Sequence, residues 1–336
     1  MRDARLAELN RENNRSIEFE NKLFLEEMKK WLDTIMVHEV KKPTLDQYQY
    51  AFSGRIAKFA PFKKLKMKDL TSALLKEFVT YENQLGLDPD TVRKDFSNIS
   101  KFLEYLWRLE LIHENLAKRG TKPRKKRKQQ DVYTLDELNK LLELFKDDPI
   151  YLYVMLAANY GMRRSEICGL KWDAVDLKNG YLDVRATGVV DCGKVIYSDS
   201  TKSKSSRRRL PLSKSVSDAL KMERFKQQQN KAKFGSEYKD NGFVCCWTDG
   251  SPLRPDYISN HYKKVILKKG FRFVRLKNLR NTAATVLHNQ GFDVKNIQGL
   301  LGHADVQTTA NIYVCFDEQN MHGMVDTLSD ALRPKV

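Results

Sequence analysis

The strongest constraint on the fold is a basic run near the middle of the chain, Lys118–Lys128, with the sequence KRGTKPRKKRK. Eight of its eleven residues are Lys or Arg, and the other three are Gly, Thr and Pro. Because its charges repel one another and it has no apolar side chain to bury, this run cannot fold against itself. We therefore interpret residues 118–131 as a linker between two domains.

Before this linker, apolar residues recur at helical spacing. Two such sets are Phe24, Met28, Trp31 and Ile35, and Val92, Phe96, Ile99, Leu103 and Leu106. Thr44 with Gln47 has the spacing of a capping box that opens another helix, and Asp88-Pro89 marks the chain before the second set. We expect an all-helical domain over residues 16–117, preceded by a polar extension of residues 1–15.

After the linker the pattern changes twice. Thr134 and Glu137 form a second capping box, and apolar residues at 151–158 predict a helix that runs into GMRRSEICGLKW. Residues 181–190, 194–199 and 207–212 alternate like three short strands, and helices resume at about Ser213 and continue to Leu332. The fold class predicted is therefore mainly α, with a small antiparallel three-stranded sheet in the second domain, residues 132–316.

Residues 317–336 follow this domain as a tail or helix. Their apolar side chains have no obvious place in it; they are Met324, Val325, Leu328 and Leu332. We expect this helix to pack on a neighbouring protomer and to couple the subunits. Packing on its own domain is the alternative.

The charge balance indicates the kind of partner. Lys and Arg number 60 against 43 Asp and Glu, and the formal charge is +17. Such an excess favours a polyanion, of which nucleic acid is the commonest. The basic run fits a solvated tether, a nuclear localisation signal, or a segment that lies along a DNA backbone. We favour the third role, with contacts from Arg124, Lys125, Lys126, Arg127 and Lys128.

Membrane and metal partners are not indicated. No apolar run approaches the ~18 residues that span a bilayer, and the polar start is not that of a signal peptide. The five cysteines show neither metal-ligand nor disulfide spacing; they are Cys168, Cys192, Cys245, Cys246 and Cys315. We expect reduced thiols, a cytoplasmic location on the nucleoid, and no metal or other cofactor.

Four islands of polar residues remain to be explained. They are Tyr160-Gly-Met-Arg-Arg-Ser-Glu166, Thr201-Lys-Ser-Lys-Ser-Ser-Arg-Arg-Arg-Leu-Pro211, Lys277-Asn-Leu-Arg-Asn-Thr282, and Leu301-Gly-His303 followed by Thr308-Thr-Ala-Asn-Ile-Tyr313. Each alone is weak, since a single Tyr on an amphipathic helix usually belongs to a core. In this order they resemble the catalytic domain of the tyrosine recombinases, or phage-type integrases. The resemblance covers residues 134–316, and the helical domain before it looks like the core-binding domain of that family.

The resemblance assigns a role to each island, and the chemistry agrees. Tyr313 would attack the phosphodiester and form a phosphotyrosine, so that religation needs no ATP. Arg163 and Arg280, with forked guanidinium groups, suit the non-bridging oxygens that gain negative charge. Lys202 would protonate the leaving 5′ oxygen, with Lys204 as a weaker candidate. His303 would donate a hydrogen bond to a non-bridging oxygen; its alternative is a helix cap.

The third island departs from the family at one position. The family usually has His-x-x-Arg-His there, whereas this chain has Lys277-Asn-Leu-Arg280-Asn. Residues three apart share a helix face, so we expect Lys277 to point where the His would. A charged lysine has donors but no acceptor, which favours a hydrogen-bond donor over a general base.

Several other functions fit parts of the sequence. A non-catalytic DNA-binding regulator explains the charge but not the four islands. A type IB topoisomerase would share this chemistry but needs no partner subunits. A metal-dependent transposase is disfavoured because no acidic cluster repeats in a ligand-like arrangement, and a serine recombinase because nothing near the N-terminus suggests its nucleophile. Within the family we favour a mobile-element integrase over a host Xer-like chromosome-dimer resolvase. The expected partners are double-stranded attachment sites, three further copies of the chain in a tetramer on DNA, and a directionality factor.

Overall fold

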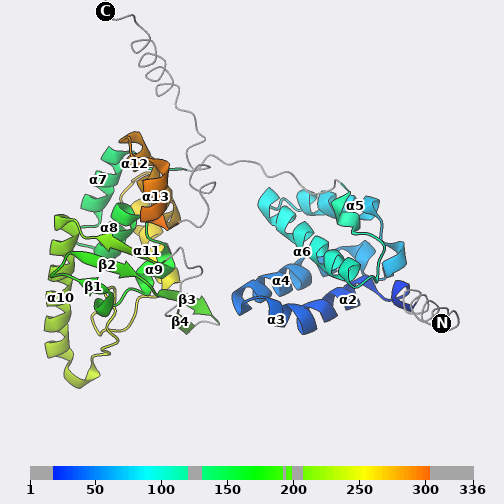
Figure 1. The fold of residues 1–336 in the computed structure, drawn as a ribbon, viewed down its shortest axis with the longest axis horizontal. Helices are drawn as coiled ribbons and strands as arrows, with labels where there is room; N and C mark the ends of the chain where they lie inside the picture. The colour runs from blue at the N-terminus through cyan, green and yellow to red at the C-terminus, as the bar shows by residue number, and fades with distance from the viewer. Residues whose placement is uncertain (1–17, 120–130, 192–193, 199–206, 303–336) are drawn as a thin grey trace, which may run out of the picture. The chain divides into compact units, whose positions relative to one another are not determined.

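The computed structural model describes residues 18–119, 131–191, 194–198 and 207–302. The chain forms two compact units, Met1–Lys128 and Gln129–Val336 (Figure 1). Each has its own apolar core. Helices predominate and a small three-stranded antiparallel sheet lies in the second unit, so the predicted fold class is confirmed. None of the described helices is both long enough and apolar enough to span a membrane.

The first unit is built from helices and helical turns. Its α-helices are α2 (Phe24–Trp31), α3 (Val37–Glu39), α4 (Lys42–Gly54), α5 (Ser72–Gln84) and α6 (Pro89–Arg108). The turns between them are the π-helix η1 (Leu32–Met36) and the 3-10 helices η2 (Ile56–Lys58), η3 (Ala60–Phe62), η4 (Met67–Asp69) and η5 (Leu116–Lys118). Aromatic rings fill the core: the ring centroid of Phe62 lies 4.9 Å from that of Phe24 and 5.3 Å from that of Phe78.

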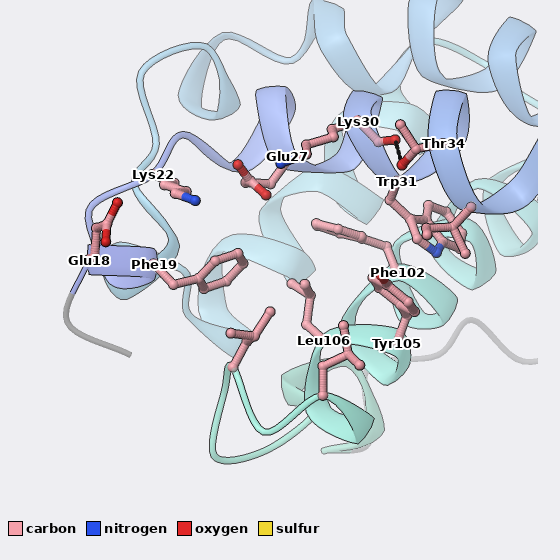
Figure 2. Close-up of a pocket in the computed structure, with 13 residues that line it drawn as sticks. Glu18, Phe19, Lys22, Glu27, Lys30, Trp31, Thr34, Phe102, Tyr105 and Leu106 are labelled. Atoms are coloured by element: carbon pink, nitrogen blue, oxygen red, sulfur yellow. Dashed lines mark hydrogen bonds between the residues drawn. The ribbon is translucent and has the colours of Figure 1, made fainter. Parts of the chain in front are cut away.

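This aromatic core is open to the surface at one side. A pocket of about 310 Å³ lies there, and Figure 2 shows Phe19, Phe102 and Leu106 around it with Lys22 and Glu27 at its edge. All the residues that line this pocket belong to the first unit.

One of the two predicted helix starts in this unit is wrong. Helix α4 begins at Lys42, with Lys41 as its N-cap residue and Pro43 in its first turn. Proline suits that turn because its φ is preset and its missing N–H is not needed there. Thr44 is therefore already inside the helix, and the capping box predicted from it does not form. The start of α6 is as predicted, because the Asp88 carboxylate accepts the N–H of Asp90 and Pro89 opens the helix.

Three ionisable side chains meet in the first unit: Arg55 at the end of α4, which is partly exposed, and the buried Glu82 of α5 and Asp95 of α6. We call them the acidic cluster. Arg55 binds both carboxylate oxygens of Asp95, with Nη2 at 2.9 Å from Oδ1. Glu82 is fully buried, and its carboxyl oxygens have no hydrogen-bond partner among the described residues. Burial, and then the negative charge of Asp95, raises the pKa of Glu82 to about 8 against the opposing effect of Arg55.

The second unit surrounds one buried helix. Its α-helices are α7 (Leu135–Leu144), α8 (Tyr151–Tyr160), α9 (Arg164–Cys168), α10 (Lys214–Phe234), α11 (Pro255–Lys268), α12 (Leu279–Asn289) and α13 (Val294–Leu301). Three 3-10 helices accompany them: η6 (Trp172–Ala174), η8 (Gly235–Glu237) and η9 (Leu276–Asn278). Helix α8 is apolar on nearly every side and is packed against α7, α10 and α12. The capping box of Thr134 and Glu137 opens α7 as predicted.

The strands differ in part from the prediction. Strands β1 (Val175–Asp176), β2 (Tyr181–Val184) and β5 (Arg208–Pro211) form the antiparallel sheet in the order β1-β2-β5, while β3 (Thr187–Asp191) and β4 (Lys194–Ser198) form a separate hairpin. The strand expected over residues 181–190 is thus two strands, and β1 was not predicted. The chain turns away after β2 to pack β3 against α9, so closely that a Cβ on Gly169 would lie 2.7 Å from the backbone of Thr187.

Candidate active site

The predicted site residues divide into those the structure describes and those it does not. Arg163, Lys277 and Arg280 are described. The remaining predicted residues lie outside the described residues: Lys202, His303, Tyr313 and the basic positions Arg124, Lys125, Lys126, Arg127 and Lys128. The expected C-terminal helix at 324–332 lies outside them as well.

The turn between α8 and α9 brings the first and third islands together. Helix α8 ends at Gly161, whose φ of +57° is in the left-handed region that favours glycine. The Gly161 carbonyl accepts a hydrogen bond of 2.8 Å from Nη1 of Arg280. A Cβ at this position would lie 2.3 Å from the Leu301 side chain, so both the backbone angle and the packing require glycine.

Arg163 is held by the carboxylate three residues after it. It is the N-cap residue of α9, and its N–H donates to Oε2 of Glu166 at 2.9 Å. Its Nη1 donates to Oε1 of Glu166 at 2.6 Å, and its Nη2 donates to the Gly302 carbonyl at 3.1 Å. The side chain is 38% exposed, so this guanidinium, which has five N–H donors, keeps some of them for an external acceptor.

A third arginine, Arg208 of β5, shares the same carboxylate. Its Nη1 and Nη2 donate to the two oxygens of Glu166 at 3.3 and 3.0 Å. Its Nε donates to the Leu300 carbonyl at 2.7 Å, so Arg208 and Arg163 both bind carbonyls at the C-terminal end of α13. That end of a helix carries partial negative charge, which suits two cations.

Arg280 is also buried, with 8% of its surface exposed. Burial, and then the positive charges of Arg163 and Arg208, lowers its pKa to about 9, although Glu166 opposes the change. It therefore stays charged at neutral pH while lacking its usual hydration. An anion that replaces water here gains a strong interaction.

We call Arg163, Glu166, Arg208 and Arg280 the arginine cluster. Burial on its own would raise the pKa of the Glu166 carboxyl, but hydrogen bonds and charge from Arg208 and Arg163 outweigh it, and the pKa is lowered. The carboxylate is thus ionised at neutral pH. Since three guanidinium groups face one carboxylate, the cluster keeps a net positive charge that suits a phosphate group.

Lys277 differs from Arg280 in exposure. It lies in η9, a 3-10 turn that precedes α12, and its side chain is exposed whereas that of Arg280 is buried. Residues three apart share a face in a 3-10 turn as in an α-helix, so the spacing does not explain this difference. Arg280 lies on α12, which packs against α8, whereas Lys277 lies on the turn before it. Within the described residues, no hydrogen bond or ion pair joins Lys277 to the arginine cluster.

The chain that follows the linker fixes the segment carrying Lys277 and Arg280. The Asp131 carbonyl accepts from Nδ2 of Asn278 at 3.1 Å, and the N–H of Tyr133 donates to the Thr282 hydroxyl at 3.2 Å. The start of α12 is therefore tied to the first described residues after the basic run.

Comparison with known proteins now identifies the family. A model of the phage integrase family matches residues 131–320, more than half of the chain. The chain belongs to the phage integrase family. The ordered islands of the sequence predicted this membership correctly, and the protein is a tyrosine recombinase.

Three similar proteins illustrate the range of this integrase's relatives. The tyrosine recombinase XerC-like protein of Caldanaerobacter subterraneus subsp. tengcongensis is 25% identical over 335 residues, which cover 95% of this chain and 85% of the relative. The Tn1549 transposon integrase in complex with transposon right end DNA has a TM-score of 0.77 at 17% identity, covering 92% of this chain and 100% of the other. A lambda integrase tetramer bound to a Holliday junction has a TM-score of 0.66 at 18% identity, covering 85% of this chain and 76% of the other. The two structures establish the fold.

Sequence reasoning missed two members of the arginine cluster as site residues. Glu166 stood within the first island but received no role. Arg208 stands in the run Arg207-Arg208-Arg209, where the three residues look equivalent. Strand alternation was the available signal: Leu210 is buried, and residues two apart on a strand share a face, so Arg208 had to point inward.

Proposed function

We propose that this integrase cuts and rejoins DNA strands with Tyr313 as its nucleophile, and that it integrates and excises a mobile element. The arginine cluster carries the proposal. Arg163 and Arg208 bind carbonyls at the C-terminal end of α13, Arg280 lies near them, and the residue that follows Gly302 in the chain is His303. The first three islands, far apart in the sequence, therefore meet beside the start of the fourth.

The reaction needs only groups of the chain and of DNA, and water. The Tyr313 hydroxyl gives its proton to water as its oxygen attacks the scissile phosphorus, a 3′-phosphotyrosine bond forms, and the bond to the 5′ oxygen breaks. Lys202 gives that leaving oxygen its proton. A 5′ hydroxyl of a partner strand then attacks the phosphotyrosine and releases the tyrosine, so the bond energy is conserved.

Arg163 and Arg280 stabilise the charge that develops on the non-bridging oxygens, and His303 adds a hydrogen bond to one of them. Arg163 is suited to this by its exposed donors, and Arg280 by its lowered hydration. We expect Arg163→Ala and Arg280→Ala each to slow cleavage by roughly two orders of magnitude or more, the effect of a lost transition-state donor. A loss of DNA affinity alone would instead make these arginines backbone clamps.

The test is a nicked duplex that traps the covalent intermediate by releasing its short 5′ fragment. The wild-type integrase should form a protein–DNA adduct on it. Tyr313→Phe should bind the same duplex without forming the adduct, because only the nucleophilic oxygen is removed. Tyr181→Phe removes the hydroxyl of an exposed tyrosine in β2 and serves as the matched control. An adduct with Tyr313→Phe would refute the assignment.

Lys277 is proposed as a hydrogen-bond donor rather than a base. Its exposed position on η9 allows it to reach a bound phosphate. Lys277→Ala should slow cleavage, and Lys277→His should recover much of the rate below about pH 6.5, where imidazole is charged. A Lys277→His variant that gains activity above about pH 7 would establish the base instead.

The mobile-element role is proposed over host chromosome-dimer resolution. The likeness to the Tn1549 transposon integrase fits the first role, and the XerC-like relative, which matches 95% of the chain, fits the second. The deciding experiment offers the purified integrase the DNA that flanks its own gene. Joining of the two flanks into a circle, aided by a directionality factor, supports the mobile element. Activity restricted to a chromosomal resolution site supports the resolvase.

Assembly and location follow from this function. We propose that four protomers join on paired double-stranded sites, with the lambda integrase tetramer on a Holliday junction as the precedent. Because the substrate is chromosomal DNA, we place the integrase on the nucleoid in the cytoplasm. Native mass measurement of the synaptic complex tests the tetramer.

The basic run is proposed to bind DNA phosphates. Phosphate binding carries no sequence information, so replacing Arg124–Lys128 with Ser should weaken binding to all sequences alike. The slope of log affinity against log salt concentration should flatten by about one unit for each phosphate that the variant no longer binds. An unchanged slope would show that the run is only a solvated tether.

A further inference from the structure

We propose that Arg208 is a positioning residue for strand cleavage, which orients Arg163 through Glu166 and holds the end of α13. The proposal rests on the function proposed above. Its basis is the set of bonds by which one planar guanidinium joins three elements: β5, which carries it, α9, which carries Glu166, and the C-terminal end of α13.

Arg208 acts through other residues because it is too buried to act on DNA. Only 6% of its side chain is exposed, against 38% for that of Arg163. Its fork binds both oxygens of Glu166 and its Nε binds the Leu300 carbonyl, a geometry that a lysine, with one compact ammonium, cannot reproduce.

The shared carboxylate explains how Arg208 affects Arg163. Glu166 is buried and ionised, so it requires cationic partners. With Arg208 present, its charge is divided between two guanidinium groups. Without Arg208, the carboxylate would draw Arg163 into a closed pair, and the positive charge that Arg163 presents to a phosphate would fall. The Leu300 carbonyl would lose its partner as well, two residues before Gly302 and three before His303.

The strand itself supplies a control. Arg209, the next residue of β5, points to the opposite face, is 66% exposed, and binds the carboxylate of Asp183 on the surface at 2.8 Å. Arg208→Lys and Arg209→Lys therefore make the same chemical change one residue apart, at a buried and at an exposed ion pair. Exposed pairs contribute little, so Arg209→Lys should behave as wild type.

The experiment measures single-turnover adduct formation on the nicked duplex with the full chain, together with DNA affinity and melting temperature. Arg208→Lys should lower the cleavage rate about 10- to 100-fold, the effect of a misplaced catalytic group. It should fold and bind DNA normally, because a cation still faces Glu166. Arg208→Gln, which leaves Glu166 without this cation, tests the same orientation of Arg163 and should also slow cleavage. A double-mutant cycle combines Arg208→Lys with Arg163→Ala. The double variant should cleave no more slowly than Arg163→Ala alone, since Arg208 acts through Arg163.

Each other outcome overturns the proposal. A folded Arg208→Lys that cleaves at the wild-type rate removes the positioning role. Effects that multiply in the double variant show that Arg208 acts independently of Arg163. If both Arg208 variants fail to fold, the role is structural. A wild-type chain that forms no adduct refutes the proposed function first, which separates that failure from a failure confined to Arg208.

Discussion

Each unit of this integrase buries a cluster of charged side chains, but the balance of charge is opposite in the two. In the acidic cluster of the first unit, one arginine binds one carboxylate and a second carboxyl group, that of Glu82, lies near them. In the arginine cluster of the second, two arginines share one carboxylate and a third lies near them. Burial acts on both in the same direction, since it disfavours every charged form.

The two clusters resolve their surplus charge by different means. In the acidic cluster, the pKa of Glu82 is raised to about 8, and a proton neutralises the surplus acid at neutral pH. In the arginine cluster, the pKa of Glu166 is lowered, and that of Arg280 falls only to about 9, so no proton is lost at neutral pH. The surplus positive charge is left for an external anion. A buried cluster that cannot neutralise itself is thus the one suited to bind phosphate.

The largest expected difference between the clusters is their response to loss of the carboxylate. Glu166→Gln leaves Arg163 and Arg208 without an anion and should lower the free energy of unfolding by about 3–5 kcal/mol, the cost of removing one partner of a buried pair. The carboxyl group of Glu82 holds a proton in the folded state but is ionised in the unfolded state at pH 7, so Glu82→Gln should raise the free energy of unfolding rather than lower it. Denaturant unfolding measures both, and equal losses would contradict the contrast.

The pH dependence of stability should sharpen the same contrast. The folded-state pKa of Glu82 is above its unfolded value, so its stabilising effect is full below about pH 4.5 and is lost as pH rises to about 8. The folded-state pKa of Glu166 is lowered, so its effect is present above the unfolded pKa and is lost in acid. Wild type should therefore lose stability relative to Glu82→Gln between pH 5 and 8, by up to about 1.4 kcal/mol per pH unit.

Because each unit has its own core, the two can unfold separately, and hydrogen exchange resolves them. As pH rises, the amides of α5 and α6 in wild type should exchange increasingly faster than the same amides in Glu82→Gln, after correction for the intrinsic exchange rate. Parallel curves for the two proteins over this range would show that Glu82 is ionised in the folded state.

The sequence alone predicted those helix starts that depend on neighbouring residues, and the family, which depends on the order of the motifs. The start of α6 at Asp88 and the capping box at Thr134 depend on neighbours within three residues, and both are confirmed. The expected start at Thr44 failed because Pro43 fits the first turn better, a competition between two local rules. The family followed from motifs whose order along the chain needs no coordinates.

The remainder depended on tertiary structure. Arg55 and Asp95 are 40 residues apart, and no local pattern joins them to Glu82. Arg208 could be separated from its two basic neighbours only by the register of β5. The exposure of Lys277 and the burial of Arg280, three residues apart, depended on the packing of the second unit and not on spacing. In each case the decisive fact was which side of an element faces the interior.

The smallest expected effect uses inorganic phosphate as a probe of the surplus charge. If the arginine cluster binds phosphate, inorganic phosphate at ten times its dissociation constant should stabilise the second unit by about 1.4 kcal/mol. The reason is that a ligand that binds only the folded state stabilises it. Protection from hydrogen exchange should appear in α9 and α12 and be absent from α5 and α6, whose buried cluster has no surplus positive charge. Arg280→Gln should abolish the protection, while chloride at matched ionic strength should not produce it. Equal protection of both units would show that phosphate acts only as a general salt, and that the charge balance of the two clusters does not govern anion binding.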